Sequence, residues 1–168
     1  PRILEVVHQL AEQHNLLLFG DLQCSSQVGS ITRFKNFSLL CPNEREARLA
    51  LQDKDSVLEQ LSQRLVQITG TERLVMKLGP EGFIAYDRDA DGLLSSQAFP
   101  ALSVNPLDVA GAGDSLLALF STGLASGQAM MPTAALACCM AALAVETMGN
   151  TPISAAALRS TLEETLQL

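Results

Sequence analysis

The sequence predicts an α/β fold with a mainly parallel sheet and a hairpin toward one edge. Short, unbroken apolar runs alternate with longer segments whose apolar residues recur at helical spacing, as in parallel strands joined by helices. Polar or glycine-containing segments follow several of the apolar runs, as expected at the carboxyl ends of parallel strands. The chain has 168 residues, of which 48% are hydrophobic. We therefore expect residues 1–168 to form a single domain with a substantial core.

Composition argues against two classes of partner and indicates a compartment. The net charge of −7 disfavours binding to nucleic acid or an anionic membrane, because both need a basic surface. The four cysteines lack Cys-x-x-Cys spacing, so we expect reduced, buried thiols in a cytoplasmic protein. The most apolar run, Met130–Val145, contains Pro132 and is short for a membrane span, so a buried helix is predicted. The N-terminus alternates apolar and charged residues, unlike a signal peptide.

The first 21 residues predict a helix, a strand and a polar residue at the strand end. Apolar residues at helical spacing indicate an amphipathic helix over the first dozen positions. The run Leu16–Phe19 then predicts a buried parallel strand. Asp21 follows it at the carboxyl end, where open α/β sheets bind ligands. A purely structural turn at Asp21 is an equally good interpretation.

Asn43 and Glu46 follow a second predicted strand, Phe37–Cys41. Both carry oxygen ligands, which suit a hard cation directly or through its waters. Taken alone, the same residues are also typical of a helix cap with acidic residues in the first turn. The two interpretations stay open at this point.

A helix and a third strand lead to a candidate phosphate-binding loop. Asp55-Ser56 predicts the helix start, and Gly70 predicts its end. The strand Leu74–Leu78 carries Lys77 near its end and runs into Gly79–Gly82. A lysine there is placed to meet phosphates, and a glycine loop is able to wrap a nucleotide. A solvated lysine beside a tight turn is the alternative.

A hairpin is predicted next. Phe83–Tyr86 continues as a strand and Leu93-Leu94 starts the returning one. Between them, Asp87–Gly92 imitates the start of an EF-hand calcium loop, but Ala98 stands where the loop needs a bidentate Glu. A polar hairpin turn is therefore favoured over a calcium site. Ala101–Val104 predicts one more short strand.

The segment Asp108–Leu116 (DVAGAGDSL) is the centre of the candidate site. It follows the turn-like Asn105-Pro106 and precedes an apolar helical run. Glycines at a helix start let a ligand approach the backbone and leave N–H groups for an anion. Asp114 lies in the first turn, where a carboxylate is able to accept a proton from a substrate hydroxyl. The alternative is that Asp114 only stabilises the helix N-terminus.

Three further segments complete the prediction. Gly123–Pro132 predicts a connecting loop. The alanine-rich helix that follows is apolar all round and closes at Glu146–Pro152. Ser154 then starts a last amphipathic helix.

The motif DVAGAGDSL resembles the signature of the PfkB (ribokinase-like) family of carbohydrate kinases, Asp-x-x-Gly-Ala-Gly-Asp-x-Phe, with Leu116 replacing Phe. Asn43-x-x-Glu46 resembles the second PfkB motif. The resemblance implies the C-terminal part of a three-layer ribokinase-like fold with a mainly parallel sheet. It also implies that Asp114 is the catalytic base and that Gly111, Ala112 and Gly113 form an anion hole.

The resemblance further implies the cofactors ATP and Mg²⁺, together with a monovalent cation, K⁺, near the Glu146–Pro152 loop. The acceptor it implies is a hydroxyl of a sugar or sugar phosphate. The residues expected at the metal are Asn43, Glu46 and Asp108. Those expected to bind the nucleotide are Lys77, Gly79, Glu81, Gly82 and Gly149.

The resemblance covers nearly the whole chain but only the later part of the family's fold. The early strands, the lid over the sugar and the Gly-Gly acceptor motif have no counterpart. We therefore expect weak nucleotide binding and no sugar phosphorylation by these 168 residues alone, and exposed sheet edges that could favour a homodimer.

Within the family, the layout is most similar to the kinase domain of bacterial ADP-heptose synthases. Two other functional classes remain open: an NAD(P)HX dehydratase-like lyase of the same superfamily, and a non-catalytic nucleotide-binding module.

Overall fold

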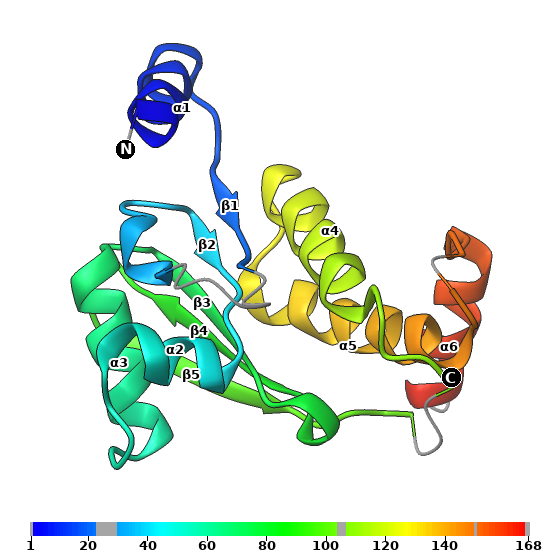
Figure 1. Cartoon of the computed structure of the whole chain (residues 1–168). Coiled ribbons are helices and arrows are strands. Elements are labelled where there is room, and N and C mark those ends of the chain that lie inside the picture. Colours follow the sequence, from blue (N-terminus) through cyan, green and yellow to red (C-terminus); the bar gives the residue numbers. More distant parts are fainter. Residues whose placement is uncertain (1, 23–29, 104–106, 150, 167–168) are drawn as a thin grey trace. The chain divides into compact units, whose positions relative to one another are not determined.

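A computed structural model describes residues 2–22, 30–103, 107–149 and 151–166 and has an α/β architecture (Figure 1). Its strands are β1 (Phe19–Gly20), β2 (Leu39–Leu40), β3 (Arg73–Lys77), β4 (Phe83–Arg88) and β5 (Leu94–Phe99). Its α-helices are α1 (Arg2–His14), α2 (Glu44–Leu51), α3 (Leu58–Thr69), α4 (Ala112–Ala125), α5 (Met130–Glu146) and α6 (Ala155–Leu166). Two short 3-10 helices, η1 (Ile31–Arg33) and η2 (Gly79–Glu81), lie between them.

The strands form one sheet in the order β1-β2-β3-β4-β5. β1 pairs with β2 and β2 with β3 in parallel, with Leu39 opposite both Phe19 and Arg73. β4 and β5 form a hairpin whose turn is closed by the Asp89 N–H donating to the Leu93 carbonyl at 3.0 Å. The predicted α/β class, the parallel pairing and the hairpin toward one edge are confirmed.

The chain divides into two compact units, and the division passes through β4 and β5. Unit 1 comprises Pro1–Lys77 and Tyr86–Ser95, and unit 2 comprises Leu78–Ala85 and Ser96–Leu168.

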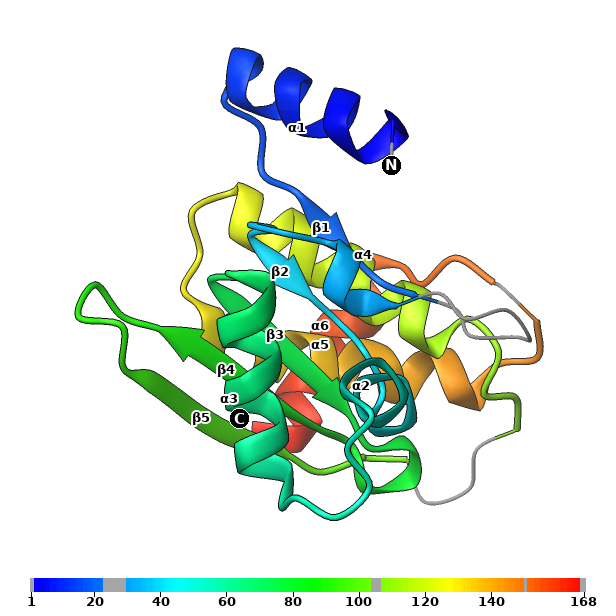
Figure 2. The same cartoon turned by 60° about the vertical axis from the view of Figure 1, so that its left-hand side comes forward.

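The core of unit 1 is built on β2 and β3. Leu39, Leu40 and the centre of β3, Leu74–Met76, are fully buried. α3 packs on β3 with Leu61 and Leu65, and α2 lies beside α3 (Figure 2). The apolar runs at β2 and β3 therefore form buried strands, as their composition predicts.

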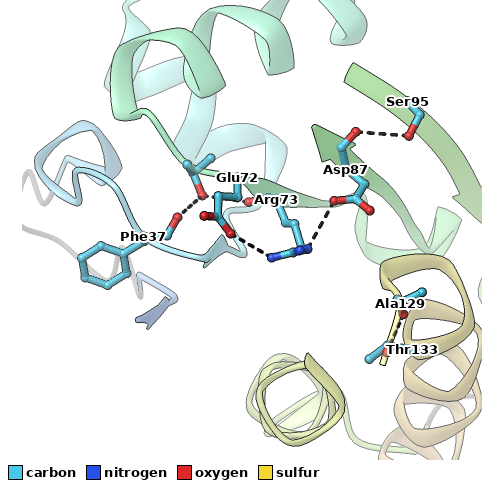
Figure 3. A network of polar contacts seen from close by, with 8 residues as sticks. Phe37, Glu72, Arg73, Asp87, Ser95, Ala129 and Thr133 are labelled. Carbon is cyan, nitrogen blue, oxygen red and sulfur yellow. Dashed lines mark hydrogen bonds and ion pairs between the residues drawn. The ribbon is translucent and has the colours of Figure 1, made fainter. Parts of the chain in front are cut away.

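Arginine-centred ion pairs join β3 to the hairpin within unit 1. Arg73 lies between the carboxylates of Glu72, at 3.0 Å, and Asp87, at 3.2 Å (Figure 3). The Ser95 hydroxyl donates to the Asp87 carbonyl at 3.1 Å. The ion pair of Arg73 with Asp87 thus holds the amino end of β3 against the hairpin, and the Ser95 bond ties the two strands of the hairpin together.

Unit 2 is organised around α4 and α5, which pack against each other, with α6 beside α5 (Figure 1). Phe83 stacks on Phe99 with ring centroids 5.2 Å apart, and Phe120 of α4 meets Phe83 edge to face at 6.0 Å. The aromatic cluster thus fixes α4 to the strand segments that belong to this unit. No helix in the described ranges is long and apolar enough to cross a membrane.

Two predictions in unit 1 need correction. The run Leu16–Phe19 is not a buried strand: β1 is only Phe19–Gly20, at the edge of the sheet, and Leu16 and Leu17 are 57% and 46% exposed. Asp55-Ser56 does not cap α3, whose N-cap is Val57. Instead Asp53 accepts hydrogen bonds from Ser56, because its carboxylate closes the preceding turn.

Two predictions in unit 2 are also wrong. Ala101–Ser103 form no strand, and Val104, Asn105 and Pro106 lie outside the described residues. The predicted loop Gly123–Pro132 is mostly helical, since α4 continues to Ala125 and α5 begins at Met130. Gly123 is tolerated in α4 because the helix packs tightly there.

The predicted state of the cysteines is confirmed where the structure describes them. Cys41, Cys138 and Cys139 are free and buried. Cys24 lies outside the described residues.

We expect Gly123→Ala to destabilise the protein. A Cβ at Gly123 would lie 2.6 Å from Thr133 Cγ2 and 3.0 Å from its Oγ1. Thr133 is held in place because its hydroxyl donates to the Ala129 carbonyl at 2.8 Å (Figure 3). Overpacking costs about 1–3 kcal/mol and the gain in helix propensity returns about 1, so the free energy of unfolding should fall by about 1 kcal/mol. Urea denaturation measures the change.

The matched background for this test is Thr133→Ala. There the obstructing atoms are gone, so Gly123→Ala should become neutral or stabilising. An equal loss in both backgrounds would contradict close packing at this crossing.

Candidate functional site

Polar side chains converge at the carboxyl ends of β1, β2 and β3 in unit 1. Lys77, the last residue of β3, forms a salt bridge with Asp21, which follows β1, at 2.6 Å between Nζ and Oδ2. The side chains of Lys77 and Asp21 are 20% and 17% exposed. The other carboxylate oxygen of Asp21 accepts the Leu22 N–H at 2.8 Å. Asp21 is therefore not only a turn residue, because its carboxylate also pairs with the Lys77 ammonium.

Asn43 and Glu46 form a complete capping box at the start of α2. The Asn43 side chain accepts the Glu46 N–H at 2.8 Å, and Glu46 Oε2 accepts the Asn43 N–H at 2.8 Å. Glu46 is only 5% exposed. Asn43 also bridges to Lys77, whose N–H donates to the Pro42 carbonyl at 2.9 Å. The helix-cap interpretation is thus confirmed, and the backbone bridge places the capping residue Asn43 next to Lys77.

Asn43 and Glu46 also carry oxygen ligands of the kind that bind Mg²⁺ together with phosphate oxygens. The described residues contain no group of three or more His, Cys, Asp or Glu side chains able to hold a metal. Mg²⁺ does not require such a group, because it retains waters and is commonly bound by one or two carboxylates plus phosphate oxygens. The oxygens of Asn43 and Glu46 fit that mode.

Cys41 directly follows β2 and is fully buried. Burial raises the pKa of its thiol strongly, the Asp21 carboxylate raises this pKa further, and the Lys77 ammonium opposes the shift. The thiol is therefore neutral at physiological pH, so the anionic partner of Lys77 here is Asp21.

The predicted nucleotide loop is the turn between β3 and β4. Gly79 and Gly82 have φ values of 62° and 94°, which favour glycine. The Leu78 N–H donates to the Gly82 carbonyl at 2.8 Å, and Glu81 is exposed. A Cβ on Gly82 would lie 2.1 Å from the Phe99 carbonyl oxygen. Gly82 is thus required by close backbone packing.

The glycine motif begins α4 in unit 2. Gly111 is the N-cap with φ of 79°, and it makes no side-chain cap hydrogen bond. The first turn then consists of Ala112, Gly113 and the exposed Asp114. A helix start without a side-chain cap leaves first-turn N–H groups for water or an anionic ligand, at the positive end of the helix dipole.

Asp108 and Gly149, which are distant in sequence, meet beside this helix start. The Asp108 carboxylate accepts the Ala110 N–H at 2.9 Å and the Gly149 N–H at 3.3 Å. The Val145 carbonyl accepts the N–H groups of Leu107 and Asp108, at 2.7 and 3.1 Å. These bonds tie the glycine motif to the end of α5. The sequence analysis missed Val145, because a backbone carbonyl in an apolar helix carries no signal in the sequence.

The candidate residues therefore gather in two sets. Unit 1 brings together Asn43, Glu46, Lys77 and Asp21, and the structure adds the pairing of Asp21 with Lys77. In unit 2 the residues of the glycine motif are contiguous at the start of α4, Asp108 contacts Gly149, and Gly79, Glu81 and Gly82 form the β3–β4 turn.

A lysine ammonium and a helix N-terminus are groups that bind phosphate. Carboxylates beside such groups serve as metal ligands or as a general base. The chemistry of both sets suits transfer of a phosphoryl group.

Comparison with known sequences identifies related proteins. The model of the pfkB family of carbohydrate kinases matches residues 1–156. The chain is 30% identical over 129 residues to the bifunctional protein HldE of Pelobacter propionicus, over 74% of the chain and 25% of that protein. It is 28% identical over 160 residues to HldE of Trichlorobacter lovleyi, over 93% of the chain and 31% of that protein. The chain thus spans a quarter to a third of the length of these relatives.

Solved structures share the fold at low identity. Arabidopsis thaliana ribokinase complexed with ribose and ATP superposes with a TM-score of 0.79 at 20% identity, over 96% of this chain and 52% of that one. Escherichia coli phosphofructokinase-2 in complex with potassium gives a TM-score of 0.77 at 17% identity, over 96% and 51%. The predicted ribokinase-like fold is confirmed, and the chain covers about half of each of these structures.

The raised pKa of Cys41 predicts a loss of stability at alkaline pH. The thiol stays protonated in the folded protein while it ionises in the unfolded chain near its ordinary pKa of 9.0. The unfolded state then binds fewer protons, so the free energy of unfolding falls as the pH rises above about 9. Denaturant unfolding at several pH values under reducing conditions measures this slope. Cys41→Ala should make the fall shallower, and an unchanged slope would contradict the shifted pKa.

Proposed function

The chain belongs to the PfkB family of carbohydrate kinases, and from this membership we propose that the protein containing it transfers a phosphoryl group from ATP to a sugar or sugar phosphate hydroxyl. The observation that carries the proposal is the start of α4. There Gly111 adopts a left-handed conformation, gives no side-chain cap, and precedes an exposed Asp114 in the first helical turn. An anion hole beside a carboxylate is the arrangement that phosphoryl transfer to a hydroxyl needs.

In this proposal Asp114 accepts the proton of the attacking hydroxyl. Backbone N–H groups of Gly111, Ala112 and Gly113 stabilise the negative charge that develops on the transferred group. These donors are backbone groups of a packed helix, so little reorganisation accompanies the reaction.

We assign the nucleotide to Lys77, Gly79, Glu81, Gly82 and Gly149. Lys77 supports this assignment, because its ammonium lies at the carboxyl ends of three parallel strands. Gly79 supports it, because this glycine is exposed in the turn that follows Lys77 and has open space beside it, and Gly82 closes that turn.

We assign Mg²⁺ to Asn43, Glu46 and Asp108, directly or through its waters, where it would neutralise phosphate charge. A monovalent cation is proposed beside the Asp108 carboxylate and the Val145–Gly149 segment. Escherichia coli phosphofructokinase-2 in complex with potassium, which shares the fold, supports this proposal.

The relatives of known structure are about twice as long as the matched region. We therefore propose that residues 1–168 supply the nucleotide side of a larger kinase and do not phosphorylate sugars alone, because phosphoryl transfer depends on positioning of the acceptor. β1 lies at a sheet edge, and an uncovered edge would favour a homodimer of the isolated chain.

A substrate screen of the full-length protein separates this function from its competitors. Release of ADP that depends on a sugar or sugar phosphate supports the kinase. Turnover of hydrated NADH would instead indicate a lyase of the same superfamily, and ATP binding without transfer to any sugar would indicate a nucleotide-binding module.

Asp114→Asn should lower kcat of the full-length protein by at least ~10², the scale of general-base catalysis. The affinity for ATP should change little, because the anion hole consists of backbone groups. A coupled ADP assay gives kcat, and calorimetry gives the ATP affinity.

The matched control is Asp91→Asn, which removes a charge from the exposed β4–β5 turn and should leave kcat unchanged. Near-normal turnover by Asp114→Asn would exclude it as the base.

Glu46→Gln should raise the Mg²⁺ concentration required for half-maximal rate several-fold. The amide oxygen is still able to accept the Asn43 N–H, so the capping box is kept while the charge is lost. Initial rates across a magnesium titration at fixed ATP measure the effect.

Glu44→Gln provides the control, because Glu44 lies in the same helical turn and pairs with Arg48. Should both variants respond to magnesium as the wild type does, Glu46 would be a helix cap only.

A further inference from the structure

The ion pair of Asp21 and Lys77 crosses the end of an intervening strand. Asp21 follows β1 and Lys77 ends β3, while β2 lies between these strands in the sheet. Neighbouring strands are about 4.8 Å apart, so the backbones that carry the pair are separated by roughly 10 Å. The side chains nevertheless meet at 2.6 Å. Lys77 is therefore directed across the carboxyl end of β2, where α2 begins.

Hydrogen bonds to the backbone fix both members of the pair. One carboxylate oxygen of Asp21 is fixed by the Leu22 N–H at 2.8 Å. The Lys77 backbone is fixed by its hydrogen bond to the Pro42 carbonyl at 2.9 Å. With both side chains about four-fifths buried, at 17% and 20% exposed, the ammonium has a defined position.

The ammonium keeps hydrogen-bonding capacity in that position. It has three donors, and the contact with Asp21 requires one of them. A positively charged group with donors to spare therefore remains where β1 and β3 end, on the residue whose backbone bridges to Asn43.

We propose that Asp21 is a positioning residue that holds the Lys77 ammonium in place for the phosphates of the bound nucleotide. This inference rests on the proposed function. A free lysine side chain loses considerable conformational freedom when it binds a phosphate, and a lysine already anchored loses less. At a distance of 2.6 Å the carboxylate is also neutralised by the ammonium, so its repulsion of a phosphate is reduced.

Calorimetry on the full-length protein, with ATP–Mg²⁺ and with adenosine as ligands, tests this role. Asp21→Ala should weaken ATP binding about tenfold, the scale of one charge-assisted hydrogen bond. Adenosine lacks phosphates, so its Kd should stay within about twofold. Equal losses for both ligands, or unchanged or tighter ATP binding, would overturn the proposal.

A double-mutant cycle with Lys77→Met isolates the coupling. If Asp21 acts through Lys77, Asp21→Ala should have no further effect on ATP binding once Lys77 is replaced. Additive losses would show that Asp21 acts independently of Lys77 and would overturn the proposal.

Asp21→Asn serves as a second variant. It retains an acceptor oxygen for Lys77, so its ATP affinity should lie between those of the wild type and Asp21→Ala. If the alanine variant does not fold, a wild-type affinity in Asp21→Asn overturns the proposal.

The matched control is Glu72→Ala. It breaks an ion pair with Arg73 at the opposite end of the same strand (Figure 3) and should leave the ATP Kd within about twofold.

A readout without nucleotide distinguishes failure of this inference from failure of the proposed function. Acetylation of Lys77, followed by mass spectrometry, should be faster in Asp21→Ala, because the anchored ammonium is released. Suppose that acetylation is faster in Asp21→Ala but the full-length protein binds no ATP. The Asp21–Lys77 contact would then stand, while the proposed function and the phosphate role of Lys77 would both be overturned. Unchanged acetylation in a protein that does bind ATP would overturn the anchor alone.

Discussion

Parallel pairing of β1 with β2, and of β2 with β3, sets the position of every candidate residue in unit 1. Parallel strands end at the same edge of the sheet, so residues that follow each strand are brought together although they are far apart in the chain. The register is continued past β2 by the Lys77 N–H bond to the Pro42 carbonyl. Asp21, Asn43 and Lys77 then meet, and the start of α2 adds Glu46. Polar groups at this edge satisfy one another, which explains how a lysine and a glutamate are accommodated with little exposure.

Unit 2 positions its glycine motif by helix packing and backbone hydrogen bonds. The close approach of α4 to α5 at Gly123 and Thr133 fixes the helix axis. At its start, Asp108 and the Val145 carbonyl connect the preceding loop to the end of α5. The result is a helix N-terminus that is rigidly held yet carries no side-chain cap. In the proposed reaction, a preorganised donor set of this kind would stabilise developing charge without reorganisation.

The family match and the local contacts give different kinds of information about this chain. The PfkB match extends over residues 1–156 and shows the family, from which the class of reaction is proposed. The hydrogen bonds and ion pairs indicate which side chains have the position and the charge for a given role. Asp21 illustrates the difference, because its pairing with Lys77 comes from the structure of this chain alone.

Local interactions let the sequence determine much of this protein. The helical periodicity of α3, the helix-cap interpretation of Asn43 and Glu46, Gly70 at a helix end and the hairpin turn each act within a few residues, and the structure bears each of them out. The motif at 108–116 identified the family for the same reason, since its residues are contiguous.

Contacts between distant segments were decided only by the tertiary structure. Asp21 and Lys77 are 56 residues apart, and Asp108 and Gly149 are 41 apart, so neither pairing leaves a local pattern. Burial depends on neighbours in the same way: Leu16 and Leu17 look like a strand core but are exposed beside the edge strand β1. Ala101–Ser103 have no strand structure although their composition suggested it. A strand exists only where a partner supplies its hydrogen bonds, and the partner is chosen by the fold.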